Sequence, residues 1–142
     1  MLCLDVNVLV HAFVRASPSH ERCATWLESA LQDRQAMALP LATLSGFVRI
    51  VTSRLVFPTP STPDRATEFT DWLLAHPRTL IPPTNQSVYD ISRDLIREHG
   101  LSGNDVPDAF LAATALHLGA TLVTADRGFR RFGSPAVLDP CS

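Results

Sequence analysis

The chain has 142 residues, a length typical of one domain and enough to bury a proper hydrophobic core. Its 46% hydrophobic and 18% charged residues exclude a disordered chain, and no apolar stretch is long enough to span a bilayer. The net charge of −2 gives no global sign of nucleic-acid binding, although Arg127, Arg130 and Arg131 form either a local basic cluster or an ordinary solvated surface.

The N-terminal segment Met1–Leu4 predicts a buried strand that Asp5 ends. Because Asp5 interrupts the apolar run and no basic residues precede it, we expect no signal peptide and a cytoplasmic protein. The three cysteines, Cys3, Cys23 and Cys141, have no metal-binding spacing and are odd in number. We therefore expect reduced thiols rather than a disulfide framework.

Short apolar strands alternate with helical segments along the rest of the chain. This alternation predicts an α/β fold whose sheet is covered by helices on both faces, and no linker or repeat divides the chain. The predicted helices fall within residues 17–35, 41–55, 62–76, 85–100 and 105–119, and the predicted strands are 1–4, 37–39, 80–81, 121–124 and 136–138.

Four aspartates are expected to meet in such a fold. Asp105 and Asp108 are three residues apart at the start of the helix that Gly119 terminates, so both carboxylates emerge from one helical face. Asp5 and Asp126 each follow a predicted strand, and ligands bind at the carboxyl edge of parallel sheets. Because neighbouring carboxylates repel one another, we expect Mg²⁺ or Mn²⁺ to hold them together.

Each of these polar residues also has an ordinary structural explanation. Asp105 is a candidate helix N-cap, with Asp108 as the acid three positions later. Asp5 and Asp126 are candidate turn residues. Asn7 is either a turn former or a side chain that orients a carboxylate or a metal-bound water. The five histidines show no paired ligand spacing, so we expect no zinc site.

Two segments, LDVNVLVHAF and NDVPDAFLAATALHLGATLVTADRGFRRF, resemble the PIN-domain ribonucleases, and specifically the VapC toxins of toxin–antitoxin pairs. The resemblance spans nearly the whole chain. It implies one three-layer α/β/α domain over residues 1–142 with a mainly parallel sheet. It further implies metal-dependent RNA hydrolysis at Asp5, Asp108 and Asp126, a VapB-type antitoxin as inhibitory partner, and a homodimer.

One position departs from the pattern of this family. VapC-like proteins carry a glutamate in the helix that corresponds to Leu41–Thr52, but the matching place falls at or next to Gly46, and the segment contains no acid. Asp105 is the candidate replacement, and we expect it to join the other three aspartates as a metal ligand. The alternatives are a water held by Thr43 or Ser45, or a less active enzyme.

Two other functions are open, the first because of the missing glutamate and the second because a phosphatase can also begin with a strand followed by an aspartate. The first is a PIN-like module that binds RNA or a protein with little or no catalysis. The second is a metal-dependent phosphatase, which is disfavoured because Asn7 replaces the second aspartate of its D-x-D motif and the chain contains no lysine. For a nuclease, single-stranded RNA or loops are the expected substrate.

Overall fold

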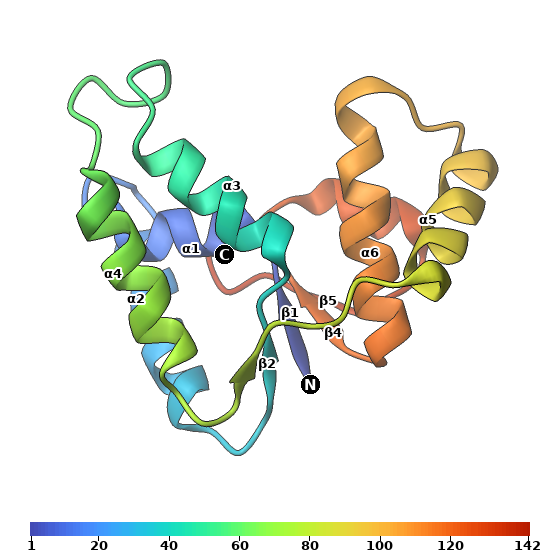
Figure 1. The fold of residues 1–142 in the computed structure, drawn as a ribbon, viewed down its shortest axis with the longest axis horizontal. Helices are drawn as coiled ribbons and strands as arrows, with labels where there is room; N and C mark the ends of the chain where they lie inside the picture. The colour runs from blue at the N-terminus through green and yellow to red at the C-terminus, as the bar shows by residue number, and fades with distance from the viewer.

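The computed structural model describes all 142 residues and has one central sheet with helices on both faces (Figure 1). The sheet contains five parallel strands in the order β3-β2-β1-β4-β5. The strands are Leu2–Leu4 (β1), Met37–Ala38 (β2), Thr79–Leu80 (β3), Thr121–Val123 (β4) and Val137–Leu138 (β5). The predicted three-layer α/β/α fold with a mainly parallel sheet is confirmed.

Six α-helices and two 3₁₀-helices connect the strands. The sequence analysis predicts five of the α-helices but misses the first, whose apolar residues follow one another almost without a break and hide the helical period. No helix is both long enough and apolar enough to cross a membrane. The helices are Val6–Phe13 (α1), His20–Gln32 (α2), Leu41–Val51 (α3), Pro63–Leu74 (α4), Gln86–His99 (α5), Gly103–Asp105 (η1), Val106–Leu118 (α6) and Arg127–Phe132 (η2).

The helix ends follow the expected capping chemistry. Thr62 and Asn85 cap α4 and α5, because each side-chain oxygen accepts a backbone N–H of the first turn. Gly100 and Gly119 end α5 and α6 in the left-handed conformation, each with φ of 60°. Ser19 stands at the predicted N-cap of α2 but makes no side-chain cap bond. The stop of α6 at Gly119 fixes where β4 begins.

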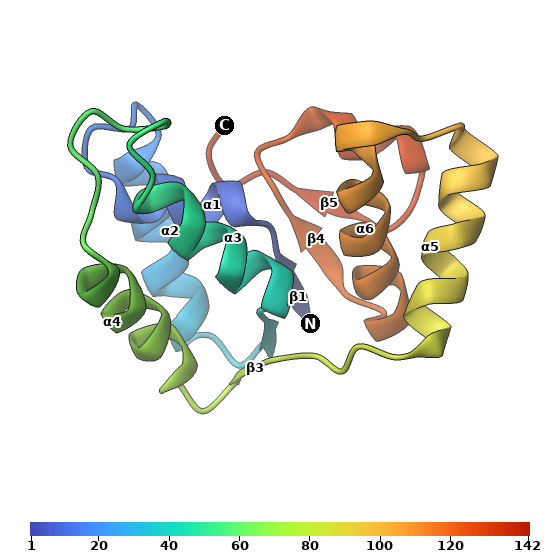
Figure 2. The ribbon, with the colours of Figure 1, turned by 45° about the horizontal axis from the view of Figure 1, so that its top comes forward.

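The first of two hydrophobic cores lies between the sheet and helices α1–α4. Figure 2 shows these four helices together on one side of β1 and β4. Phe13, Phe47 and Phe69 meet there, with ring centroids 5.1 to 5.2 Å apart. Leu2 and Leu4 of β1 also belong to this core. The aromatic cluster ties α1, α3 and α4 to one another.

The second core lies between the sheet and helices α5 and α6, on the opposite side of the molecule (Figure 2). Cys3, whose side chain alternates with those of its neighbours in β1, belongs to this core. Helix α6 contributes mainly small side chains, because Ala109, Ala112, Ala113 and Ala115 are all fully buried. Small residues allow the α6 backbone to lie close to the sheet, which fixes the position of its first turn.

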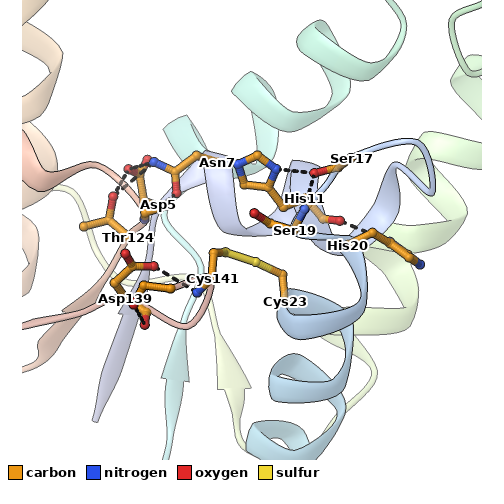
Figure 3. The surroundings of a disulfide bond; sticks show 12 residues. Asp5, Asn7, His11, Ser17, Ser19, His20, Cys23, Thr124, Asp139 and Cys141 are labelled. Carbon is orange, nitrogen blue, oxygen red and sulfur yellow. Dashed lines mark hydrogen bonds between the residues drawn. A yellow bond between two sulfur atoms is a disulfide. The ribbon is translucent and has the colours of Figure 1, made fainter.

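A disulfide joins Cys23 of α2 to Cys141 of the C-terminal tail (Figure 3). The expectation of three reduced thiols is therefore wrong, and only Cys3 is free. The two bonded cysteines are 118 residues apart in the sequence, and only the fold brings their Cα atoms to 5.3 Å. That separation is normal for a disulfide, but no spacing in the sequence reveals it.

Candidate metal centre

The centre of the site is the edge where β1 and β4 end side by side. The two strands are paired along their length, with Leu4 opposite Val123. Asp5 follows β1 directly, and Thr124 and Asp126 follow β4. The chain leaves β1 toward β2 on one side and later returns to β4 on the other side. Such a switch point is where open parallel sheets bind their ligands.

Asp5 is buried at this edge, with only 8% of its surface exposed. One carboxylate oxygen, Oδ2, accepts hydrogen bonds from Thr124 Oγ1 at 2.7 Å and from Asn7 Nδ2 at 2.8 Å. The other, Oδ1, accepts from the backbone N–H of Val6, which makes Asp5 the N-cap of α1. Asn7 therefore orients a carboxylate, one of the two roles left open by the sequence. Figure 3 shows the three side chains together.

Thr124 is a member of the site that the sequence analysis does not single out. Its buried hydroxyl donates to Asp5 and accepts from Asn7 Nδ2 and from the backbone N–H of Asp126, both at 3.0 Å. One hydroxyl thus links the ends of both strands. The available signal is the T-A-D pattern at the end of β4, because a threonine two residues before an acid can bond to both strand ends.

Asp126 caps the 3₁₀-helix η2 and is exposed to solvent. Its Oδ1 accepts the backbone N–H of Gly128 at 2.7 Å. A Cβ atom on Gly128 would lie only 3.0 Å from the same oxygen, so glycine keeps this turn open. The turn explanation for Asp126 therefore holds, and it also places the carboxylate beside the end of β4.

Asp108 lies in the first turn of α6 and is bound by Arg131 of η2. The distance from Arg131 Nη2 to Asp108 Oδ2 is 2.8 Å, and Arg131 Nη1 lies 3.7 Å from Asp105 Oδ1. Asp105 makes no side-chain cap bond, so the capping explanation for Asp105 is wrong. The structure brings Asp105 and Asp108 together through one shared guanidinium group.

The carboxylates of the site act on one another electrostatically. Burial raises the pKa of Asp5; hydrogen bonds from Thr124 and Val6 oppose this shift, and the charges of Asp108 and Asp126 add to it. Burial also raises the pKa of Asp108, with Arg131 opposing the shift. Because these pKa values are raised, ionising Asp5 and Asp108 costs free energy in the folded protein, and a bound cation would offset that cost.

Asp105 lies at the margin of this group. Its charge contributes to the raised pKa of Asp108 but not to that of Asp5. Its side chain is 59% exposed, compared with 26% for Asp108. Three aspartates therefore form the inner group, and Asp105 reaches it through Asp108 and Arg131.

No three acidic, histidine or cysteine side chains are gathered closely enough to ligate one ion. Hydrogen bonds hold the carboxylates instead: Asp5 is held by Thr124, Asp126 by Gly128 and Asp108 by Arg131. The donor set is nevertheless all oxygen, which suits Mg²⁺ or Mn²⁺. Mg²⁺ keeps several of its waters and is held directly by only one or two carboxylates, so the residues fit a hydrated divalent metal although no three of them lie close together.

The family model of the PIN domain matches residues 2–135 of this chain. The chain belongs to the PIN domain family. Ribonuclease VapC43 of Mycobacterium tuberculosis is 41% identical to it over 132 residues, which is 93% of this PIN domain chain and 90% of the relative. The chain is thus a VapC-like member of the family.

Solved structures carry the same PIN fold. FitAcB from Neisseria gonorrhoeae matches with a TM-score of 0.64 and 25% identity, covering 99% of this chain and 98% of that one. VapBC2 from Rickettsia felis, bound to a DNA fragment from its promoter, matches with a TM-score of 0.71 and 18% identity, covering 96% of each chain. Both support the arrangement of strands and helices described above.

A cavity of about 530 Å³ opens beside the acids of this PIN domain. Asp5 and Asp108 lie at its wall, and α3 and α6 supply most of its apolar lining. Its lining residues are Asp5, Val6, Pro40, Leu41, Ala42, Thr43, Gly46, Arg49, Pro82, Pro83, Thr84, Val88, Val106, Pro107, Asp108, Phe110, Leu111 and Thr114.

Gly46 lines this cavity, at the place where the resemblance to VapC toxins leads us to expect a glutamate. A Cβ atom built on Gly46 would meet only Val6, at 3.4 Å, so the helix has room for a side chain there. Thr43, one turn earlier, donates its hydroxyl to the backbone carbonyl of Leu4 and is buried. Arg49, one turn later, is exposed and takes part in no ion pair. In this protein, α3 therefore offers the cavity a cation instead of an acid.

Proposed function

We propose that this chain is an Mg²⁺- or Mn²⁺-dependent endoribonuclease toxin that hydrolyses RNA phosphodiester bonds and is held inactive by a VapB-type antitoxin. One observation carries the proposal: Asp5 and Asp126 follow the paired strands β1 and β4, and Asp108 in the first turn of α6 lines the same cavity as Asp5. The surrounding fold is a PIN domain with 41% identity to a protein named a ribonuclease.

The metal would be held by the carboxylates of Asp5, Asp108 and Asp126. When bound, such an ion polarises the scissile phosphate and lowers the pKa of a bound water. Thr124 and Asn7 donate hydrogen bonds to Asp5 and so favour its charged form. In the net hydrolysis, a water oxygen forms a bond to phosphorus, a phosphorus–ribose oxygen bond breaks, and the departing oxygen gains a proton.

Several side chains around the acids suit an RNA strand. Arg127 and Arg130 are exposed beside Asp126, where they would contact the phosphate backbone. Phe110 is 39% exposed and lines the cavity, which suits stacking against an unpaired base. Arg49 lines the same cavity without a carboxylate partner. This arrangement supports single-stranded or looped RNA as the substrate class.

The same cavity suits the antitoxin. Its apolar walls between α3 and α6 would accept apolar side chains of a partner segment, and its acidic end would accept an arginine. An arginine on Asp108 would compete with the metal. Substituting Leu41, which is 59% exposed at the wall of the cavity, by asparagine should weaken partner binding without changing Mn²⁺ affinity, because it removes the apolar side chain and adds no charge. Recovery of only unpartnered protein from the native host would count against this part of the proposal.

The decisive experiment maps cleavage of cellular RNA after induced expression, comparing the wild type with Asp5→Asn. We expect discrete cuts with the wild type and none with the variant. With purified protein, a chelator should abolish cleavage, and added Mn²⁺ should restore it. Cleavage that persists in the chelator contradicts the metal dependence.

Asp108→Asn distinguishes a nuclease from a binding module. The substitution removes one charge at nearly constant shape, so the fold should persist while Mn²⁺ affinity and RNA cleavage fall together. A non-catalytic module would instead bind RNA without cutting it, whether Mg²⁺ or Mn²⁺ is added. The wild type and the variant would then both lack cleavage. A large fall in melting temperature would show that Asp108 acts mainly in the structure of α6.

A further inference from the structure

Arg131 is the only arginine that bridges two separate elements through ion pairs in this protein. The other paired arginine, Arg93, binds exposed acids of its own helix α5. Arg131 reaches from η2 to the first turn of α6, where it contacts Asp108 at 2.8 Å and Asp105 at 3.7 Å. This guanidinium therefore contacts Asp108, one of the three acids that we assign to the metal.

The position of Arg131 is set by its neighbour. The guanidinium carbon lies 4.9 Å from the centre of the Phe132 ring, and Phe132 is buried in the second core. The side chain of Arg131 is 33% exposed, so it is held against the protein yet reachable from solvent. A guanidinium on an aromatic face can pivot about that contact and still keep its charge.

The contact with Asp108 conflicts with metal binding. Arg131 Nη2 donates to Asp108 Oδ2, an oxygen that a divalent ion would use. A metal and a guanidinium cannot both occupy that face of one carboxylate. Because the ion pair is partly exposed to water, it is weak enough for a divalent cation to displace it.

We propose that Arg131 is a resident counter-ion of the acidic site. In the metal-free protein it neutralises Asp108, and on metal binding it leaves Asp108, keeps Asp105 as its anchor, and binds the phosphate of the RNA. The last step rests on the proposed ribonuclease function. The first two steps concern only this chain and its metal.

This assignment also gives Asp105 a role. Asp105 makes no side-chain cap bond and lies at the margin of the acids, but its Oδ1 is 3.7 Å from Arg131 Nη1 while Arg131 is still paired with Asp108. Asp105 thus acts on the metal through Arg131, as a positioning residue. As a metal ligand, it would instead act independently of Arg131. The two roles are separable by a double-mutant cycle.

The first test measures Mn²⁺ affinity by calorimetry on RNA-free wild type, Arg131→Gln and the control Arg130→Gln. Arg130 is the adjacent exposed arginine and takes part in no ion pair, so its variant makes the same charge change without freeing Asp108. We expect Arg131→Gln to bind Mn²⁺ roughly two- to five-fold more tightly, as the loss of a partly exposed pair predicts. A smaller change is expected for Arg130→Gln.

Equal or weaker Mn²⁺ binding by Arg131→Gln, with its melting temperature unchanged, overturns the proposal. So does an equal gain in both variants, because general charge then explains the result. If the wild type binds Mn²⁺ but cuts no RNA, the ribonuclease function fails while the competition between Arg131 and metal is still measured.

The second test places Asp105→Ser in the wild type and in Arg131→Gln. If Asp105 acts through Arg131, the substitution weakens Mn²⁺ binding only when Arg131 is present. Weakening of the same size in both backgrounds makes Asp105 a ligand and overturns its anchoring role.

A third test asks whether Arg131 binds the phosphate of the RNA. Arg131→Gln should then raise KM for RNA at saturating Mn²⁺ more than it lowers kcat. An unchanged KM overturns that step.

Discussion

The two helical layers of this protein are built from different side chains. The layer of α1–α4 is packed with phenylalanines and tied to the C-terminal tail by the Cys23–Cys141 disulfide. In the layer of α5 and α6, α6 is packed mainly through alanines, while α5 contributes Val88 and Leu95; we call this the alanine-rich layer. Large side chains bury more apolar surface, whereas small ones let backbones approach closely.

The two layers therefore contribute differently to the site: one stabilises the fold, and the other positions an acid. Asp5 sits at the sheet, Asp108 is carried by α6 of the alanine-rich layer, and α3 of the aromatic layer brings Arg49 but no acid to the cavity. We infer that the aromatic layer supplies most of the stability and that the alanine-rich layer determines where Asp108 lies.

The largest expected effect is on the aromatic layer. Phe47 is fully buried between two other phenylalanines, so Phe47→Ala should cost about 3 to 5 kcal/mol of unfolding free energy, measured with urea. Phe110→Ala, which removes a 39% exposed ring from α6, is the matched control and should cost much less. Equal losses would show that stability is spread evenly over both layers.

The disulfide should also stabilise mainly the aromatic layer. It closes a long loop, so reduction or Cys23→Ser should cost about 2 to 4 kcal/mol, seen as a lower melting temperature. Mn²⁺ affinity should not change, because the metal-binding acids lie on other elements. Cys3→Ala leaves the disulfide intact and serves as the control for cysteine loss. A parallel fall in Mn²⁺ affinity would contradict the division between the layers.

The alanine-rich layer should be sensitive to added volume. Ala112→Leu forces a larger side chain into a filled space and should cost about 1 to 3 kcal/mol. Because it pushes α6 from the sheet, it should also weaken Mn²⁺ binding through Asp108. His117→Leu introduces the same side chain on the exposed face of α6 and should leave Mn²⁺ affinity unchanged. Unaltered metal binding in Ala112→Leu would mean that α6 does not set the position of Asp108.

Cys3, which packs on the same side of the sheet as α6, should make the unfolding free energy of the protein depend on pH. Burial, with the charge of Asp5, raises the pKa of Cys3 to about 12 in the folded protein. Because the folded value lies above the unfolded one, the stability from the neutral thiol is present below pH 9 and is lost as pH rises toward 12. Between pH 8 and pH 10 the loss should be about 1 kcal/mol. Denaturant unfolding of Cys3→Ala should lack this slope, and an identical slope would contradict the assignment.

The smallest stability change is expected at Gly46, where the aromatic layer meets the cavity. Gly46→Ala should stabilise α3 by about 0.5 to 1 kcal/mol, because glycine is a poor helix former and the added Cβ only touches Val6. Gly46→Glu should tighten Mn²⁺ binding relative to Gly46→Ala, since it brings a fourth carboxylate to the cavity. If titration gives equal affinities for both variants, the cavity at Gly46 does not reach the metal.

The sequence predicts the fold well because local rules act within short segments. Strand-then-acid patterns locate Asp5 and Asp126, and a helix start locates Asp108. Thr124 and Arg131 escape prediction, since their partners Asp5 and Asp108 are distant in the sequence. The disulfide escapes for the same reason. What the sequence lacks in each case is a signal for a long-range contact of one particular side chain.

The pairing of β1 with β4 has a consequence for the time at which the protein acquires its site. Thr124 and Asp5, which hydrogen-bond across this junction, are 119 residues apart. The middle of the sheet therefore cannot close until nearly the whole chain has left the ribosome, and contacts of such long range form slowly. A nascent chain that has emerged only as far as α5 lacks β4, Asp108 and Asp126. On the proposed function, synthesis itself would then delay the toxin, and a partner made at the same time would meet the site as it first forms.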